Sequence, residues 1–266
     1  MGQDIKTLRT RIKSVDSTLH LTKAMGLVAS SKIRRATDAM LKSREYSAAL
    51  SEAVSLLTLC PDCKKSPYLR KAEGDRLCMV VIAGDRGLAG GYNANVFRLM
   101  REYPEAKIIP LGKRACERYG GEIRSSEHFS AAEAMTLAQD LCKAFTEGEF
   151  DRLCVVSTEY VSMLTQTPRV TQLLPLVPSE QKGRSVIFEP DELTILNSVV
   201  PTYVAGLLVA HARESFACEV AARRAAMDSA GKNAQEMIDE LQLSYNRARQ
   251  GAITQEITEI VAGSGN

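Results

Sequence analysis

Residues 5–19 read IKTLRTRIKSVDSTL, and this stretch decides the fold. Its apolar residues are spaced three and four positions apart in alternation: Ile5, Leu8, Ile12, Val15 and Leu19. This spacing places the apolar side chains in one stripe along a helix, and two such helices bury their stripes against each other in a coiled coil. The stretch therefore predicts a coiled-coil helix at the start of the chain.

The same helix is predicted to continue to residue 59, because the first proline is Pro61 and the only glycine between residues 4 and 59 is Gly26. The apolar pattern slips near Leu21 and Met25, which predicts a stutter, a local unwinding of the supercoil. The seam then resumes at Ala36, Met40, Leu50, Val54 and Leu57, with the polar Ser43 and Ser47 in two of its positions. At 1.5 Å per residue, a helix of about 55 residues would be ~80 Å long.

The end of the chain repeats this pattern. No proline follows Pro201, and the 4, 3 spacing recurs at Ala234, Ile238, Leu241, Tyr245, Ala248 and Ala252. Residues 2–44 contain ten Lys and Arg against three Asp, whereas residues 212–266 contain six Lys and Arg against eight acidic residues. Two long helices with matching stripes and opposite charge are predicted to pair antiparallel.

The middle of the chain alternates strand and helix patterns. Strands are predicted at 76–84, 107–111, 152–157, 170–177 and 185–188, and helices at 93–103, 113–119 and 131–147. Such alternation is typical of an α/β domain with a mostly parallel sheet. The predicted fold is α/β: a long antiparallel coiled coil of both termini with an inserted Rossmann-like α/β domain. The predicted domains are a coiled-coil helix at 1–59, the α/β domain at 60–197 and a second coiled-coil helix at 198–266.

Composition points to a globular protein that is not inserted in a membrane. The chain has 266 residues and a net charge of +2; 45% of its residues are hydrophobic, and it contains no Trp. The polar start gives no sign of a signal peptide, and no apolar run approaches the ~20 residues of a membrane helix. The longest such run, residues 199–212, is interrupted by Pro201. The odd number of cysteines, seven, indicates reduced thiols in a cytoplasm.

One glycine-rich stretch, GDRGLAGG at residues 84–91, follows a predicted strand and precedes a helix, where phosphate-binding loops lie. It has no Lys-Ser/Thr after G-x-x-x-x-G, and G-x-G-x-x-G is absent. A tight structural turn is the favoured interpretation, with a partner contact or an anion site as alternatives.

Two other features have the residue types of functional sites in other proteins. Cys60 and Cys63 have the spacing of half a zinc site or of a redox pair, but no second pair exists, and His20 and His128 are distant in sequence. An incidental loop pair is favoured over a thiol switch or a metal ligand. The first helix is rich in Lys and Arg but has no aromatic residue before Tyr46. Together with the small net charge, this favours an acidic protein partner over nucleic acid.

Three stretches resemble the gamma subunits of ATP synthases. They are residues 5–35, with TKAM at 22–25 and VASSK at 28–32; GDRGLAGGYN at 84–93; and DELQLSYNRARQGAITQEITEIV at 239–261. All three stand in the family's order and spacing. The chain departs from the family at Gly26, where a longer residue is usual, at Ala89, which replaces Cys, and in its ending at residues 263–266.

The resemblance implies a non-catalytic subunit, the central-stalk rotor of a proton- or sodium-translocating ATP synthase. Such a rotor couples ion flow through a membrane ring to ATP synthesis or hydrolysis in the beta subunits. Its partners would be the alpha and beta subunits, the epsilon subunit and the ring of c subunits. The implied location is peripheral, on the cytoplasmic face of a bacterial cell membrane. No catalytic residue, cofactor, metal or nucleic acid is implied.

The resemblance also implies contacts with the beta subunits. Lys23 and Met25 would face an acidic loop of beta, and Arg249, Gln250 and Thr254 would hydrogen-bond a loop of one beta subunit. A coiled-coil scaffold or a nucleotide-binding protein is the alternative function. The stretch at 239–261 counts against the first, and the missing phosphate-loop signatures count against the second.

Overall fold

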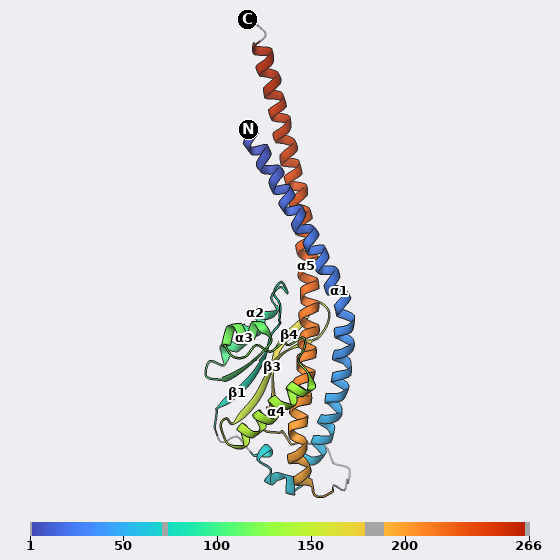
Figure 1. Cartoon of the computed structure of the whole chain (residues 1–266), viewed down its shortest axis with the longest axis vertical. Helices are drawn as coiled ribbons and strands as arrows, with labels where there is room; N and C mark the ends of the chain where they lie inside the picture. The colour runs from blue at the N-terminus through green and yellow to red at the C-terminus, as the bar shows by residue number, and fades with distance from the viewer. Residues whose placement is uncertain (1, 71–73, 179–188, 264–266) are drawn as a thin grey trace. The chain divides into compact units, whose positions relative to one another are not determined.

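The computed structural model describes residues 2–70, 74–178 and 189–263 (Figure 1). Contacts divide the chain into two compact units: unit 1 combines Met1–Ser30 with Arg223–Asn266, and unit 2 is Ser31–Ala222. Two long helices, α1 (Gly2–Thr58) and α5 (Glu192–Gly263), contribute to both units, and a sheet with its helices lies between them in sequence. The predicted fold class is confirmed, with a sheet dominated by parallel pairs and long helices at both termini.

The sheet of unit 2 has the strand order β2-β1-β3-β4. The strands are β1 (Leu77–Ile82), β2 (Lys107–Leu111), β3 (Arg152–Tyr160) and β4 (Gln166–Leu174). β1 pairs in parallel with β2 and β3, whereas β3 and β4 form an antiparallel hairpin. The edge strands β2 and β4 each contain a proline, Pro110 and Pro168, which has no N–H to offer a further strand.

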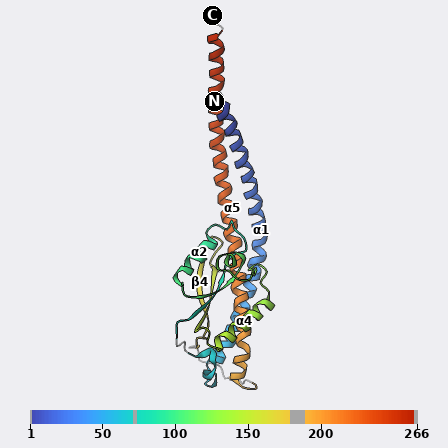
Figure 2. The same ribbon diagram turned by 60° about the vertical axis from the view of Figure 1, so that its left-hand side comes forward.

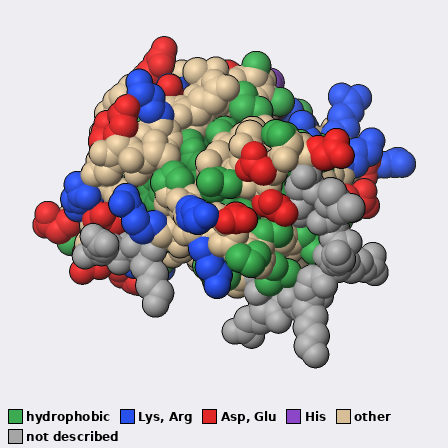
Figure 3. Space-filling view, turned by 90° about the horizontal axis from the view of Figure 1, so that it is seen from below, with side chains coloured by type: hydrophobic (Ala, Val, Ile, Leu, Met, Phe, Trp, Pro, Cys, Tyr) green, Lys and Arg blue, Asp and Glu red, His purple; other side chains and the backbone are tan. Residues whose placement is uncertain are grey.

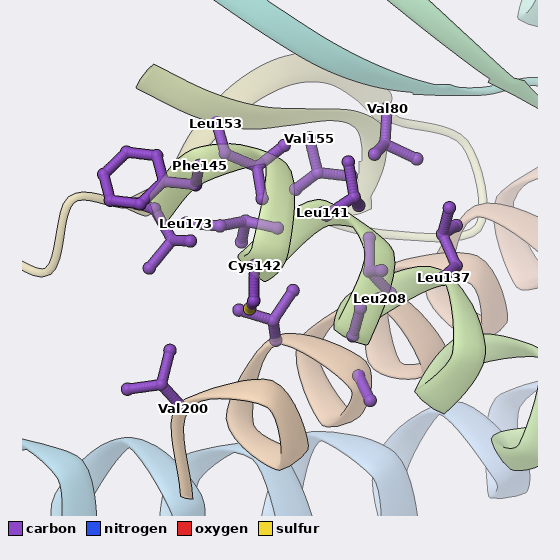
Figure 4. Close-up of a cluster of buried hydrophobic side chains, with 14 of the residues drawn as sticks. Val80, Leu137, Leu141, Cys142, Phe145, Leu153, Val155, Leu173, Val200 and Leu208 are labelled. Atoms are coloured by element: carbon purple, nitrogen blue, oxygen red, sulfur yellow. The ribbon is translucent and has the colours of Figure 1, made fainter. Parts of the chain in front are cut away.

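Helices cover both faces of this sheet because successive side chains of β1 point to opposite sides. Cys78, Val80 and Ile82 pack with α4 (Ala131–Thr146) and α5 in the larger core cluster. Figure 4 shows Val80 in this cluster with side chains of α4 and α5. Met79 and Val81 pack on the other face with α2 (Tyr92–Leu99) and with Tyr119 of α3 (Lys113–Tyr119). Figure 2 shows α2 and α4 on opposite sides of the strands.

Most predicted elements are found, with shifted ends. β4 begins at Gln166, four residues before the predicted strand, because it extends the hairpin with β3. Short 3-10 helices at Asp62–Lys65 and Pro67–Leu69 were not predicted, and the helix predicted at 93–103 ends as a 3-10 turn at Met100–Glu102. The strand predicted at 185–188 lies outside the described residues.

Helix α5 contains Pro201, which interrupts the apolar run of residues 199–212 but not the helix itself. It begins after Asp191, whose carboxylate accepts hydrogen bonds from the backbone N–H and the hydroxyl of Thr194, at 2.8 Å each. A proline inside a helix removes one hydrogen bond, and burial of the surrounding side chains offsets that loss. Leu196, Val200, Val204 and Leu208, four residues apart, are all 0% exposed.

Among the described residues, one helix contains a window apolar enough to cross a membrane by length and composition, which the sequence analysis did not find. This helix is α5, and the window has a mean hydropathy of 1.7. The side chains of Val200, Val204 and Leu208 on this helix pack in the larger core of unit 2. A third of the window is buried inside the protein, and these side chains belong to that part.

The seam of α1 does not slip, so the predicted stutter is wrong. In unit 1, Leu19 is followed by Thr22, Gly26 and Ala29, all buried at the same alternating spacing, whereas Leu21 is 59% exposed. The spacing continues in unit 2 through Ile33, Ala36, Met40, Ser43, Ser47, Leu50, Val54 and Leu57, each buried or half-buried. Small and polar residues hold the middle seam positions, so a pattern based on large apolar residues misses them.

In unit 1 the two helices run antiparallel. Leu19 packs with Ala234 and Ile238, whereas Gly26, two turns further along α1, lies against Met227 and Asp228. A Cβ atom at Gly26 would lie 3.6 Å from Asp228 Oδ1 and 3.7 Å from Met227 Cβ, which is ordinary contact distance. The seam therefore has room for a methyl group at this position.

Gly26→Ala should stabilise unit 1 by about 0.5–1 kcal/mol, because alanine loses less backbone entropy in a helix. Gly251→Ala is the matched control, since nothing lies within 4 Å of its Cβ position and only helix propensity changes. Both variants should raise the midpoint of urea unfolding followed by circular dichroism. A loss of stability for Gly26→Ala beside a gain for Gly251→Ala would show that the helices need the bare backbone there.

A buried histidine makes unit 2 sensitive to acid. His211 of α5 is 8% exposed, and its Nδ1 lies 2.9 Å from Ser157 Oγ on β3. Burial lowers the pKa of His211 from 6.5 to about 4, because the imidazolium form loses its hydration. Below pH 6.5 His211 is protonated in the unfolded chain, whereas in the folded chain it stays neutral down to about pH 4. The free energy of unfolding therefore decreases across this window as pH falls.

Between pH 7 and pH 5 this histidine should cost about 2 kcal/mol of folding free energy. The measurement is the urea midpoint of the wild type and of His211→Gln at the two pH values. The variant keeps a polar group opposite Ser157 but does not titrate, so its stability should decrease less over the same interval. Equal decreases in both proteins would contradict the assignment.

Candidate functional site

The sequence singled out two groups of residues on the helices of unit 1. Lys23 on α1 is exposed and Met25 is half-buried; on α5, Arg249, Gln250 and Thr254 are all exposed. The structure does not bring the two groups together. Lys23 lines a hollow of about 390 Å³ together with α5 residues between Met227 and Gln235. Gln235 and Arg249 are 14 residues apart on one helix, which corresponds to about 21 Å.

The hollow beside Lys23 is a consequence of the small seam residues. Thr22 faces Gly231, whose Cβ position would lie 3.7 Å from Thr22 Oγ1. Lys23, Asp228 and Lys232 lie around the hollow and are exposed, so charges of both signs surround it. These groups suit contact with a polar segment of another protein.

The second group lies where the seam ends. Ala248 and Ala252 are half-buried, and every described residue after Ala252 is exposed. Arg249 and Gln250 therefore point away from the seam, and Thr254 Oγ1 donates a hydrogen bond to the carbonyl of Gln250 at 3.0 Å. Arg249 offers the five fixed N–H donors of a guanidinium, and Gln250 adds a donor and an acceptor.

Exposed apolar side chains accompany this second group. Beyond Ala252 the apolar residues move to another face of the helix: Ile253 is 45%, Ile257 57%, Ile260 69% and Val261 65% exposed. Gln255 and Glu259 take the positions that continue the seam, and they are joined by a hydrogen bond of 2.8 Å. The last turns of α5 thus carry apolar side chains that are about half or more exposed.

The turn at residues 84–91 has the location of a phosphate loop, at the C-terminal end of β1 and before α2, but a carboxylate occupies its backbone amides. The N–H groups of Asp85 and Arg86 lie 3.4 Å from the two carboxylate oxygens of Glu219, on α5. The N–H of Gly84 donates to Asn93 Oδ1 at 2.8 Å. A Cβ at Gly84 would lie 2.7 Å from the Glu219 carboxyl carbon, so only glycine admits this approach.

Asp85 fixes the other side of the turn. Its carboxylate accepts hydrogen bonds from Ser125 Oγ at 2.6 Å and from the backbone N–H groups of Lys113, Ser126 and Glu127 at 3.0–3.1 Å. Burial tends to raise the pKa of Asp85, but these hydrogen bonds outweigh it and hold the pKa below its ordinary value. The turn is therefore held from within the fold, which favours the structural interpretation.

The cysteine pair has the properties of ordinary thiols. Cys60 is half-buried, Cys63 is fully buried, and both are free. Burial raises the pKa of Cys63 to about 11 and also raises the pKa of Cys60. The thiolate is the reactive form, so both groups exchange slowly near neutral pH. Within the described residues, no group of three or more His, Cys, Asp or Glu is arranged to hold a metal ion.

Sequence reasoning missed the buried charges of α5. Glu214 and Glu219 are 9% and 1% exposed, and Arg44 of α1 binds Glu214 at 2.6 Å. One signal was present: Glu219 lies within the otherwise apolar run Ala217–Ala221, where a charge requires a partner. That partner is 134 residues away along the chain and could not be identified from local pattern.

Comparison with known proteins agrees with this arrangement. A family model described as ATP synthase matches residues 4–265. The chain is 38% identical to the ATP synthase gamma chain of Ruminococcus albus, over 99% of this chain and 98% of that protein. It is 39% identical to the gamma chain of Desulforamulus reducens, over 97% of both chains.

Solved structures share the fold. A chain of the Euglena gracilis mitochondrial ATP synthase, in a structure of OSCP, F1 and the c-ring, matches with a TM-score of 0.69 at 17% identity. The match covers 99% of this chain and 94% of that one. A central-stalk and c-ring structure from Tetrahymena thermophila gives a TM-score of 0.61 at 18% identity, covering 79% of this chain and 99% of that one. The family match over nearly the whole length shows that the chain belongs to the ATP synthase gamma-chain family.

Proposed function

We propose that the chain is the central-stalk rotor of a bacterial ATP synthase and couples ion flow through the membrane sector to ATP synthesis or hydrolysis. As a gamma chain it is a non-catalytic subunit, and catalysis takes place on the beta subunits. The observation that carries the rotor proposal is the coiled coil of unit 1, with its narrow seam and a surface of mixed charges around Lys23, Asp228 and Lys232. Such a surface can slide past its neighbours, whereas a continuous apolar surface would adhere to them.

The proposed partners are the alpha and beta subunits, the epsilon subunit and the ring of c subunits. In support, the solved structures with the same fold are described as parts of F1, c-ring, rotor and central-stalk assemblies. On the face in Figure 3, Lys and Arg alternate with Asp, Glu and hydrophobic side chains, which suits protein contacts better than nucleic acid. We place the chain at the cytoplasmic face of the cell membrane, as a peripheral subunit.

We assign the contacts with beta to both groups of unit 1. Lys23 and Met25 face an acidic loop of beta, whereas Arg249, Gln250 and Thr254 hydrogen-bond a loop of one beta subunit. Exposure of four of these side chains supports the assignment. By function, we divide the chain into shaft helices at 1–59 and 198–266 and an α/β foot at 60–197.

The direct test is affinity purification of the tagged chain from bacterial membranes. Alpha and beta subunits should co-purify together with magnesium-dependent ATPase activity. Recovery of the chain alone, or with unrelated proteins, would contradict the proposal.

The purified chain should not bind ATP specifically, because Glu219 occupies the amides of the 84–91 turn and the motif has no Lys to hold a phosphate. Isothermal titration calorimetry with magnesium-ATP should show no saturable binding in the micromolar range. Saturable binding that is lost in Arg86→Ala would support a nucleotide-binding function instead.

Arg249→Ala combined with Gln250→Ala should assemble and keep its helix content, but impair turnover or coupling. A hydrogen bond to a charged partner contributes about 1.5–3 kcal/mol, so the rate should fall about tenfold or more. ATP hydrolysis and ATP-driven ion pumping in membrane vesicles measure the effect.

The matched control is Asn246→Ala with Arg247→Ala, an Asn-Arg pair on the same helix that is also exposed. It removes one guanidinium and one amide without touching the assigned contacts, so its activity should remain near wild type. Normal coupling in the Arg249, Gln250 double variant would count against the site and leave the rotor proposal intact.

A further inference from the structure

Unit 2 contains a set of buried polar contacts that the coiled coil and the beta contacts do not use. Glu214 and Glu219 lie five residues apart on α5, and both are at least nine-tenths buried. Buried carboxylates are unfavourable unless they are paired or hydrogen-bonded, and apolar residues would pack this helix as well. Their presence at the junction of the long helices with the sheet requires a reason beyond stability.

Glu219 joins α5 to the end of β1. Its carboxylate accepts from the N–H groups of Asp85 and Arg86, and the carboxylate of Asp85 holds residues 125–127 through three hydrogen bonds. Glu127 in turn pairs with Lys32 of α1 at 2.6 Å. A chain of polar contacts thus runs from α5 through the turn to α1.

Glu214 forms a second connection, at the end of β3. One of its oxygens accepts from Arg44 of α1 at 2.6 Å and from the backbone N–H of Tyr160 at 2.9 Å. Arg44 also donates to the carbonyl of Tyr160 at 3.1 Å. Next to it, Ser215 accepts from the N–H of Thr158 at 3.1 Å, and its carbonyl accepts from Tyr92 Oη at 2.9 Å.

These contacts differ mechanically from the hydrophobic core beside them. Apolar packing is nondirectional, so side chains can shift along a surface with little change in buried area. A hydrogen bond weakens steeply when its length or angle changes. A buried carboxylate that leaves its partners stays unpaired in a medium of low polarity, which is strongly unfavourable. Contacts of this kind resist rotation of a helix about its own axis.

We propose that this polar junction carries torque between the α/β domain and the two long helices, with Glu214 and Glu219 as positioning residues that prevent slip. The junction comprises Lys32 and Arg44 of α1, Glu214 and Glu219 of α5, and the ends of β1 and β3. This inference rests on the proposed rotor function, because only a turning shaft loads the junction in this way.

The experiment compares two changes in the same helix. Glu214→Gln with Glu219→Gln keeps the side-chain shape and removes both charges, whereas Val200→Ala with Val204→Ala removes apolar packing from the core beside the junction. Each complex is assembled in inverted membrane vesicles. ATP hydrolysis and ion transport are measured first with the gradient collapsed by an ionophore and then at full gradient, when the rotor works against a load.

Without a gradient, both variants should hydrolyse ATP at the wild-type rate. At full gradient, the Gln variant should show at least about tenfold more slip, which is ATP hydrolysis without ion transport. Tenfold is the factor expected for the loss of a single charged hydrogen bond. The Val variant should lose thermal stability but keep the wild-type ratio of ions moved to ATP hydrolysed. This load dependence distinguishes a torque-bearing role from a structural one.

A wild-type ratio for the Gln variant at full gradient would overturn the inference, and equal slip in the Val variant would do the same. If the Gln variant does not assemble, Arg44→Gln takes its place, because its half-exposed side chain can be removed with less disturbance, and it should also slip under load. Absence of ATP-driven transport with the wild-type chain would instead refute the proposed function itself.

Discussion

The approach of one buried carboxylate, Glu219, to the backbone at the end of β1 is the contact on which unit 2 depends. It requires glycine at position 84, satisfies the amides of Asp85 and Arg86, and leaves the Asp85 side chain free to organise residues 125–127. A glycine-rich turn between a strand and a helix often binds an external anion such as a phosphate group. Here the anion is the Glu219 carboxylate of the chain itself, so the turn joins the sheet to α5.

The sequence was informative where structure is local. β1 and β2 were found because runs such as LCMVVI combine β-branched and apolar residues between turn residues. The start of the coiled coil was found because large apolar residues mark its seam. The middle of the seam was misjudged because Thr22, Gly26 and Ala29 are buried by close approach of the helices rather than by their own hydrophobicity.

The partner contacts form a different case. Lys23 and Arg249 are exposed in the chain itself, and nothing in their local surroundings distinguishes them from other charged helix residues. Their assignment came from resemblance to a family, since the groups they bind belong to other chains. Glu214 and Glu219 could not be assigned from the sequence for the opposite reason. Their partners lie within the same chain but far away in sequence, so only the folded structure shows the pairs.

The prolines of the two edge strands limit backbone pairing between the sheet and neighbouring subunits. Pro110 in β2 and Pro168 in β4 interrupt the rows of N–H donors that would otherwise be open to a neighbouring strand. A subunit that moves relative to its neighbours must not form stable backbone hydrogen bonds with the exposed strands or loops of those neighbours. Closing both borders of the sheet leaves the domain to meet its neighbours through side chains and loops, whose contacts can form and break as it moves.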